Sequence, residues 1–186
     1  MLYQILSLPA IPAQLKAQAW AQAYAHGDTL NKWVLGSPHG RELVRDGHVV
    51  AQSTGLGRKR ITEEFEQWVC ENITDEFNDI GVCVSEPGLD HSGPHRDQSR
   101  NYTLLYLLQS GGDNATTKFW KTREPELELH NYYSSYDELE LLDQISAPLE
   151  TWCILDSKAI HSVENISEGR VSIQVSLNRN PWHVTK

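Results

Sequence analysis

The sequence predicts a mainly β protein, a sandwich or barrel with helices packed on its outside. Two helical patterns occupy the first part of the chain, and short segments rich in β-branched, aromatic and aliphatic residues follow from about Asp79 onward. Turn signals separate these segments at Pro87-Gly88, Gly111-Gly112 and Glu168-Gly169. Early helices followed by many short strands are typical of this architecture.

The first helix is expected over about Pro12–His26. Proline suits the start of a helix, and Gly27 stands just past the expected end. The segment is rich in alanine, the strongest helix former. Leu15, Ala19 and Ala23 make one row at i, i+4 spacing, which predicts the face turned to the core.

A second helix is expected after Thr62, which suits the N-cap position, with Glu63 and Glu64 at the positive end of the helix dipole. Its apolar residues recur at the spacing of one helix face, which continues far enough for the helix to run almost to Asn78. That face consists of Phe65, Trp68, Val69, Ile73 and Phe77.

Five later segments have the composition of strands. They are Ile80–Ser85, Tyr102–Leu108, Thr117–Trp120, Leu149–Leu155 and Val171–Leu177. The acidic stretch Tyr136–Asp143 is expected to be a solvated helix, a loop or an edge strand, or to form a substrate lid together with Tyr132-Tyr133.

Length and composition predict one domain over 1–186, with a helical part at about 1–78 and a β core at about 79–180. The apolar start, Met1 to Pro12, lacks a basic beginning and is expected to belong to the fold rather than to a signal peptide. No stretch approaches the ~18 apolar residues of a membrane helix, so no membrane partner is expected.

The net charge of -9 disfavours nucleic acid and anionic membranes as partners. The short basic run Arg58-Lys59-Arg60 is expected to be a solvated loop. Three cysteines without a CxxC spacing predict neither a disulfide framework nor a cysteine zinc site, and fit a reducing cytoplasm. The oligomeric state stays open.

The triplet His95-Arg96-Asp97 is the first candidate for metal binding. In an extended segment alternate side chains share a face, so this imidazole and this carboxylate could reach one metal ion. A second such triplet, His26-Gly27-Asp28, stands at a helix end, where glycine and histidine have an ordinary capping role.

The C-terminal part of the chain adds His161 at the end of a strand-like stretch, and then Arg170. From Arg170 to Leu177 polar and apolar residues alternate, so one face of the predicted strand is polar. If that face lines a pocket, the guanidinium needs an anion, and a carboxylate can pair with it through two hydrogen bonds. The alternative is that the polar face meets water.

Two histidines and one carboxylate leave open positions on an octahedral metal, an arrangement that points to non-haem Fe(II) oxygenases. The order His95-Arg96-Asp97, then His161, then Arg170-Val171-Ser172 resembles the 2-oxoglutarate/Fe(II)-dependent oxygenase superfamily. The passage Tyr102–Leu108, Gly111-Gly112 and Thr117-Lys118-Phe119 looks like that of prolyl-hydroxylase-like and aspartyl/asparaginyl-hydroxylase-like members. The resemblance covers about Asp79 to Asn178.

This resemblance implies a double-stranded β-helix, or jelly roll, and a dioxygenase that uses Fe(II), 2-oxoglutarate and O2. His95, Asp97 and His161 match the catalytic iron ligands, Arg170 the residue that pairs with the distal carboxylate of 2-oxoglutarate, and Ser172 an assisting hydroxyl. Many members add a tyrosine from an earlier strand. Tyr106 or Tyr102 could supply it here, unless Leu104 occupies that position.

The substrate, an amino acid, a protein or peptide side chain or a small metabolite, is left open by the sequence. Arg100 could bind a substrate carboxylate or pair with a nearby Asp, and Trp120 could line the substrate pocket or belong to the core. Two rival functions are a cupin-like metal enzyme without 2-oxoglutarate and a non-catalytic jelly roll that binds a ligand. Arg170 and Ser172 argue against the first, and the complete triad argues against the second.

Overall fold

The computed structural model describes residues 1–25, 29–32, 43–50, 57–85, 91–124, 126 and 131–182. Its helical elements are α1 (Ala13–Tyr24), α2 (Glu63–Asn72) and the 3-10 helix η3 (Tyr136–Glu138). Its strands are β1 (Tyr3–Leu6), β2 (Thr29–Lys32), β3 (Leu43–Arg45), β4 (His48–Val50), β5 (Gly57–Arg60), β6 (Asp79–Ser85), β7 (His91–His95), β8 (Tyr102–Ser110), β9 (Thr116–Thr122), β10 (Leu139–Ile145), β11 (Trp152–Asp156), β12 (Ile160–Glu164) and β13 (Arg170–Leu177).

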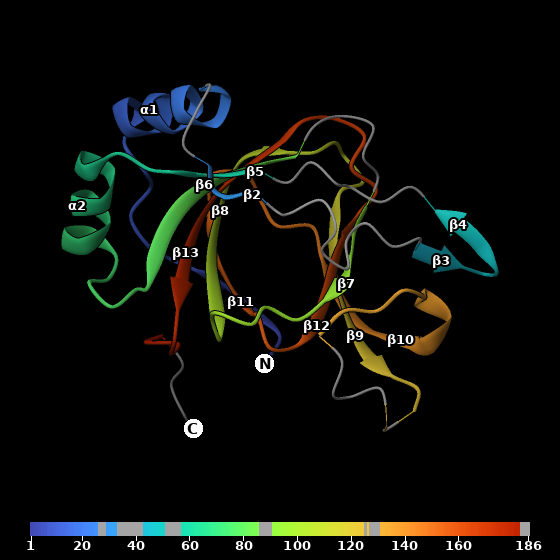
Figure 1. Ribbon diagram of the computed structural model, residues 1–186. Helices are drawn as coiled ribbons and strands as arrows, with labels where there is room; N and C mark the ends of the chain where they lie inside the picture. The colour runs from blue at the N-terminus through green and yellow to red at the C-terminus, as the bar shows by residue number, and fades with distance from the viewer. Residues whose placement is uncertain are drawn as a thin grey trace.

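Two antiparallel sheets face each other and form the body of the protein (Figure 1). The larger sheet has the strand order β1-β11-β8-β13-β6-β5-β2, and the smaller has the order β10-β9-β12-β7. The hairpin of β3 and β4 lies to one side, and α1 and α2 cover the outer face of the larger sheet (Figure 1). The prediction of a mainly β jelly roll with helices outside is therefore confirmed.

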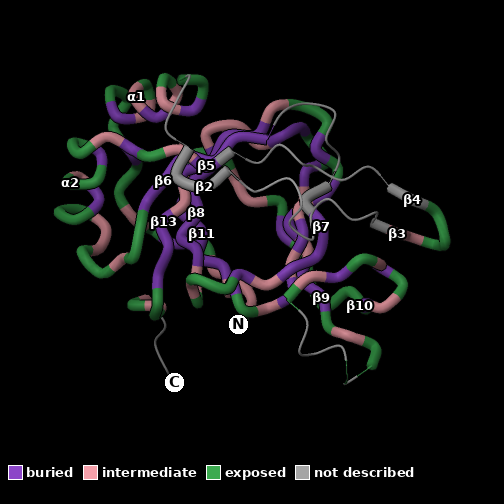
Figure 2. The backbone as a smooth tube through the Cα atoms, viewed as in Figure 1, coloured by how far each residue is buried: buried purple, intermediate pink, exposed green. Residues whose placement is uncertain are grey.

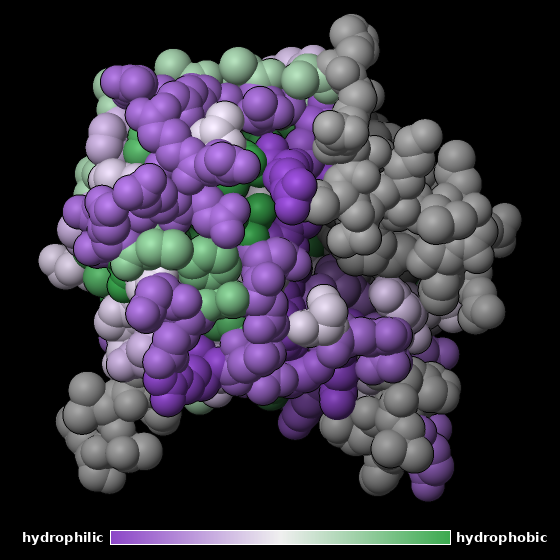
Figure 3. Space-filling model, turned by 60° about the vertical axis from the view of Figure 1, so that its left-hand side comes forward, coloured by the Kyte–Doolittle hydropathy of each residue, from purple (hydrophilic) through white to green (hydrophobic). Residues whose placement is uncertain are grey.

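The largest apolar cluster lies between the helices and the larger sheet. The predicted inner row of α1, Leu15, Ala19 and Ala23, is buried there. The buried residues of the helices and strands face one another, whereas the outer turns of both helices are exposed (Figure 2). The helix-bearing side of the molecule is accordingly mostly hydrophilic at its surface (Figure 3).

Helix α2 begins as predicted and ends earlier. The Thr62 hydroxyl accepts a hydrogen bond from the backbone N–H of Phe65 at 3.3 Å, which satisfies one free donor of the first turn. The predicted extension to Asn78 is wrong, because the backbone leaves the helical conformation at Ile73. The chain then turns toward β6, while Phe77 still packs against the main cluster.

The first 78 residues contain more strand than the sequence predicted. The apolar start forms β1, an edge strand of the larger sheet that pairs with β11. The basic run is not a solvated loop, since it forms most of β5 and pairs with β6. Arg58 is buried because alternation along β5 turns it toward Asp79 and Ser176. The acidic stretch became η3 followed by β10, an edge strand, which was one of its three expected forms.

Both faces of β13 are buried. Its apolar residues, Val171, Ile173, Val175 and Leu177, belong to the cluster beneath the helices. Its polar residues Arg170, Ser172 and Ser176 are buried as well, on the side turned toward the smaller sheet. The polar face therefore lines the interior between the sheets and is largely shielded from bulk water, with Gln174 partly exposed. No helix among the described residues is long and apolar enough to cross a membrane.

Replacing Leu104 with alanine should lower the free energy of unfolding by about 2–5 kcal/mol, because this fully buried side chain would leave a cavity in the main cluster. Leu149→Ala is the matched control, since that leucine is 52% exposed and its loss should cost no more than about 0.5 kcal/mol. Chemical denaturation measures both values. Equal losses for the two variants would contradict the assigned core.

Candidate metal centre

Pairing within the smaller sheet brings the two histidines of the candidate centre together. His95 ends β7, His161 is the second residue of β12, and the two lie directly opposite each other in the antiparallel ladder. Opposite residues of such a pair point to the same face, and here the ring centroids are 4.5 Å apart. Asp97 lies in the connection that follows β7, and its carboxylate is the third candidate ligand.

The three side chains form a compact set of possible ligands. Their nearest ligand atoms all lie within 4.8 Å of one another. Nε2 of His95 is 3.8 Å from Oδ1 of Asp97, and Nε2 of His161 is 4.0 Å from Oδ2. Two imidazoles and one carboxylate are the donor set typical of non-haem Fe(II) oxygenases, so these residues fit an Fe(II) ion.

Hydrogen bonds at the far side of each ring orient the histidines. Nδ1 of His95 lies 2.8 Å from the carbonyl oxygen of Gly93, and Nδ1 of His161 lies 3.0 Å from that of Ala159. A carbonyl can only accept, so Nδ1 carries the proton in both rings. The lone pair of the neutral imidazole is then on Nε2, the atom that faces Asp97.

The protonation states suit metal binding at neutral pH. Burial, with a contribution from His161, lowers the pKa of His95 to about 4. Burial would raise the pKa of Asp97, but Arg100 and the two histidines outweigh it and hold this pKa well below the usual range. The centre therefore offers a neutral imidazole and an ionised carboxylate, the forms that bind a metal ion.

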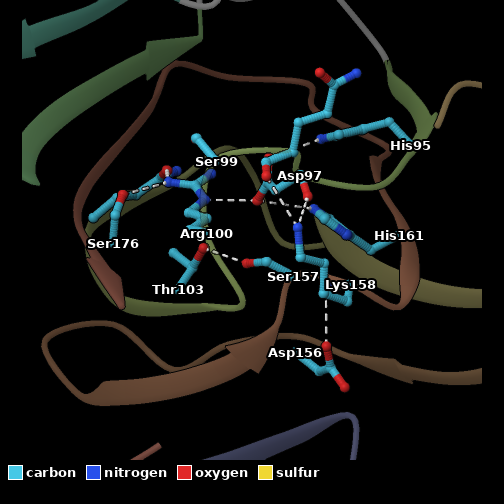
Figure 4. Close-up of polar contacts among 12 residues, drawn as sticks. His95, Asp97, Ser99, Arg100, Thr103, Asp156, Ser157, Lys158, His161 and Ser176 are labelled. Carbon is cyan, nitrogen blue, oxygen red and sulfur yellow. Dashed lines mark hydrogen bonds and ion pairs between the residues drawn. The ribbon is translucent and has the colours of Figure 1, made fainter. Parts of the chain in front are cut away.

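The connection after His95 is tied to the loop before His161. The backbone N–H of Asp97 donates to the carbonyl of Ser157 at 2.9 Å. The Lys158 ammonium donates to the carbonyls of Asp97 and Gln98 at 2.9 and 3.1 Å (Figure 4). These bonds fix the two ligand-bearing segments relative to each other. Nothing in the sequence singled out Ser157 or Lys158.

Arg100 pairs with Asp97, the second of its two expected roles. Its Nε donates to Oδ2 at 2.6 Å, and both side chains are largely buried (Figure 4). Tyr132, named in the sequence only as part of a lid, stacks beside His95 with ring centroids 6.2 Å apart. Burial, and then the charge of Asp97, raise the pKa of Tyr132.

Arg170 and Ser172 lie on the inner face of β13. Arg170 is buried, donates from Nη1 to the carbonyl of Ser110 at 2.6 Å, and has its pKa lowered to about 10 by burial. The Ser172 hydroxyl accepts a hydrogen bond from Nε2 of Gln174 at 3.3 Å. Among the described residues no carboxylate lies within 4.0 Å of the Arg170 guanidinium.

Tyr106 and Tyr102 do not lie on the inner face that carries Arg170. In the β8–β13 ladder Tyr106 lies opposite Ile173 and Tyr102 opposite Leu177, so both belong to the face turned toward the helices. Tyr106 packs against Trp152 there, with centroids 4.9 Å apart. Leu104 shares that face, while the inner face of β8 carries Thr103, Leu105 and Leu107.

Trp120 lies on the other face of the smaller sheet from His161. Its indole N–H donates to the hydroxyl of Ser162 at 2.9 Å, and the ring packs in a cluster with Ile160 on the outer face of the smaller sheet. The neighbouring residue, Phe119, lies opposite His161 and shares its inward face, with ring centroids 6.5 Å apart. Because adjacent strand residues point to opposite faces, Phe119 is the aromatic residue of this strand that faces the interior between the sheets.

No protein-family model and no curated protein sequence matches the chain. Among solved structures it is similar to a prolyl hydroxylase from Trichoplax adhaerens in complex with a peptide fragment of hypoxia inducible factor (12% identity, TM-score 0.49, 95% of this chain and 83% of that one). It is also similar to a prolyl-4-hydroxylase from Pseudomonas putida (10% identity, TM-score 0.49, 95% of this chain and 92% of that one). A third similar structure is that of an oxidoreductase of the 2OG-Fe(II) oxygenase family from Burkholderia pseudomallei (10% identity, TM-score 0.46, 96% of this chain and 88% of that one).

The chemistry of the centre rests on its own residues, which include the complete set of His95, Asp97 and His161.

Acidification should destabilise the metal-free protein between about pH 6.5 and pH 4. In this window an unfolded His95 binds a proton that the folded imidazole, with a pKa of about 4, does not, so stability falls as the pH falls. Asp97 affects the stability only at lower pH. Its pKa is lowered in the folded protein, so the stability that its ionised carboxylate contributes is lost as the pH falls below the ordinary carboxyl range.

Denaturation midpoints at about pH 7 and about pH 4.5 measure this effect. His95→Gln should reduce the difference between the two midpoints, whereas substitution of the exposed His48 by glutamine should leave it unchanged. The assignment is wrong if the wild type and His95→Gln lose the same stability over this range.

Proposed function

We propose that this protein is an Fe(II)- and 2-oxoglutarate-dependent dioxygenase that hydroxylates an amino acid, a protein side chain or a small metabolite. The 186 residues would form one oxygenase domain. The observation that carries the proposal is Arg170, a buried guanidinium without a carboxylate partner among the described residues, on the same inner face as two residues that are linked to the metal centre through Arg100.

The buried guanidinium of Arg170 needs a partner for its charge. The other buried aspartate, glutamate and arginine side chains that the structure describes each have an oppositely charged partner: Asp97 has Arg100, Glu164 has Arg45 and Lys118, and Arg58 has Asp79. An unpaired buried charge costs several kcal/mol or more. A bound dicarboxylate would supply the missing anion.

Arg170 lies at the start of the β13 face that leads to the candidate metal centre. Along the inner face of β13, Arg170 and Ser172 are followed by Gln174 and Ser176. The last two contact Arg100, which in turn contacts Asp97. One strand face therefore runs from an anion-binding end to the metal-binding end. A ligand with a carboxylate at one end and metal-binding oxygens at the other fits this arrangement, and 2-oxoglutarate is such a ligand.

The surroundings suit an oxidation that must be kept from water. Between the two sheets, apolar side chains from β8, β9 and β11 line the interior. They include Leu105, Leu107, Phe119 and Cys153, all largely buried. Exclusion of water strengthens the Arg170–carboxylate interaction and protects reactive species. When bound, Fe(II) would supply O2 activation coupled to oxidative decarboxylation of the co-substrate.

The two rival functions explain less of the site. A cupin-like metal enzyme without 2-oxoglutarate would have no evident use for the buried charge of Arg170. A non-catalytic ligand-binding protein would not need three ligand side chains with oriented rings and suitable protonation.

Three cysteines without a disulfide, of which Cys83 and Cys153 are buried, support a reducing compartment such as the cytoplasm as the place of action.

Anaerobic titration of the iron-loaded protein with 2-oxoglutarate tests the proposal directly. We expect a visible metal-to-ligand charge-transfer band in the wild type. Arg170→Ala should need on the order of 10- to 100-fold more 2-oxoglutarate for the same band, because it loses a charge-assisted pair worth roughly 1.5–3 kcal/mol.

Arg179→Ala is the matched control for this titration, since Arg179 is an exposed arginine paired with Glu76 at the surface. It should titrate like the wild type. Absence of the band from folded, iron-loaded wild type would reject 2-oxoglutarate as co-substrate and favour the two rival functions.

A further inference from the structure

We propose that Arg100 is a positioning residue that presents the Asp97 carboxylate to the metal through one oxygen; this inference rests on the proposed iron centre. Nε of Arg100 donates to Oδ2 of Asp97 at 2.6 Å, and the two side chains are only 11% and 7% exposed. Oδ1 lies 3.8 Å from Nε2 of His95, and Oδ2 lies 4.0 Å from Nε2 of His161. Because Arg100 takes one lone pair of Oδ2, Oδ1 is the oxygen that keeps both lone pairs for the ion.

Strand β13 holds Arg100 in this orientation. Nη1 of Arg100 donates to Oε1 of Gln174 and to Oγ of Ser176, both at 3.3 Å. These acceptors belong to a strand that is paired on both sides, so their backbone cannot shift without disturbing the larger sheet. Figure 4 shows the resulting chain of contacts from Ser176 through Arg100 to Asp97.

A second arginine restricts Arg100 further. Nη1 of Arg58 donates to the same Ser176 hydroxyl at 3.3 Å, and this hydroxyl donates to Oδ1 of Asp79 at 2.7 Å. A hydroxyl has one donor and two acceptor sites, so Ser176 is saturated. Gly81 leaves the space that Arg58 fills, because a Cβ there would lie 2.7 Å from the Arg58 Nε.

The charges in this network balance. Arg58 and Arg100 are the cations, and Asp79 and Asp97 are the anions. Arg58 and Arg100 share the Ser176 acceptor, and their like charges repel each other. Both effects favour the orientation of Arg100 toward Asp97.

This orientation matters for the number of open metal positions. An octahedral ion held by two imidazoles and one carboxylate oxygen keeps three positions free. A carboxylate that binds through both oxygens would take one of the three, and a chelating co-substrate and O2 together need all of them. By engaging Oδ2, Arg100 would keep the centre open for both.

Binding of Co(II) without 2-oxoglutarate tests this role, because it reports on the ligands independently of turnover. We expect Arg100→Met to weaken Co(II) binding about 10- to 100-fold, the usual effect of removing a residue that orients a metal ligand. The visible absorption spectrum of the bound Co(II) should also change, since Asp97 is then free to bind through its second oxygen.

Two further variants separate orientation from charge. Arg100→Lys keeps the charge but has no fork that can serve Asp97, Gln174 and Ser176 at once, so it should restore the wild-type affinity and spectrum only in part. Ser176→Ala removes one support of Arg100 and should shift both readouts in the same direction by a smaller amount. Arg179→Met, which removes an exposed arginine, is the matched control and should bind Co(II) like the wild type.

Circular dichroism establishes that each variant is folded. A folded Arg100→Met with wild-type affinity and spectrum overturns this inference and leaves the metal centre intact. Full restoration by Arg100→Lys also overturns it, because charge alone would then suffice. If Arg100→Met does not fold, wild-type behaviour of both Arg100→Lys and Ser176→Ala overturns it. Failure of the wild type to bind Co(II) overturns the iron centre and this inference together.

Discussion

Strand β13 lies between β8 and β6 in the larger sheet, so protein covers both its faces and both its edges. Its apolar face packs under the helices, where burial of Val171, Ile173 and Val175 stabilises the fold. Its polar face points between the sheets, where every donor and acceptor needs a partner. Arg170 at one end of that face and Ser176 near the other are therefore buried polar groups between the two sheets.

The smaller sheet supplies the two histidines of the candidate metal centre, and its register decides their separation. His95 and His161 lie opposite each other because β7 pairs with β12. A shift of this register by one residue would turn His161 to the outer face, among the residues that pack around Trp120. The loop bonds from Ser157 and Lys158 then set the place of Asp97. Backbone pairing thus brings the two histidines together, and backbone hydrogen bonds between loops place Asp97 beside them.

Buried charge is used differently in different parts of the molecule. On the outer face of the smaller sheet, Glu164 is fully buried and paired with Arg45 and Lys118, which attaches the β3–β4 hairpin to the sheet. Inside, the Arg58 and Arg100 charges are balanced by two aspartates. Arg170 stands apart from these pairs among the described residues, and this contrast makes it the residue from which the co-substrate is inferred.

Local patterns determined a large part of this protein. The alternation from Arg170 to Leu177, the i, i+4 row of α1 and the Thr62 cap each follow from periodicity or from a bond within a few residues, and the structure has all three. The candidate ligands were also evident, because few residue types bind metal and their order along the chain has a recognisable form. Such features depend on neighbours in sequence, which the sequence displays.

Contacts across strands were decided by the tertiary structure alone. Tyr106 and Trp120 had suitable chemistry but lie on the wrong faces, since a strand's facing depends on its register with partners far away in the chain. Arg58 belongs to a basic run that resembles a surface loop, yet β6 and β13 provide Asp79 and Ser176 to pair with it. The sequence by itself determined which residues could form the centre, and only long-range pairing decided which of them face it.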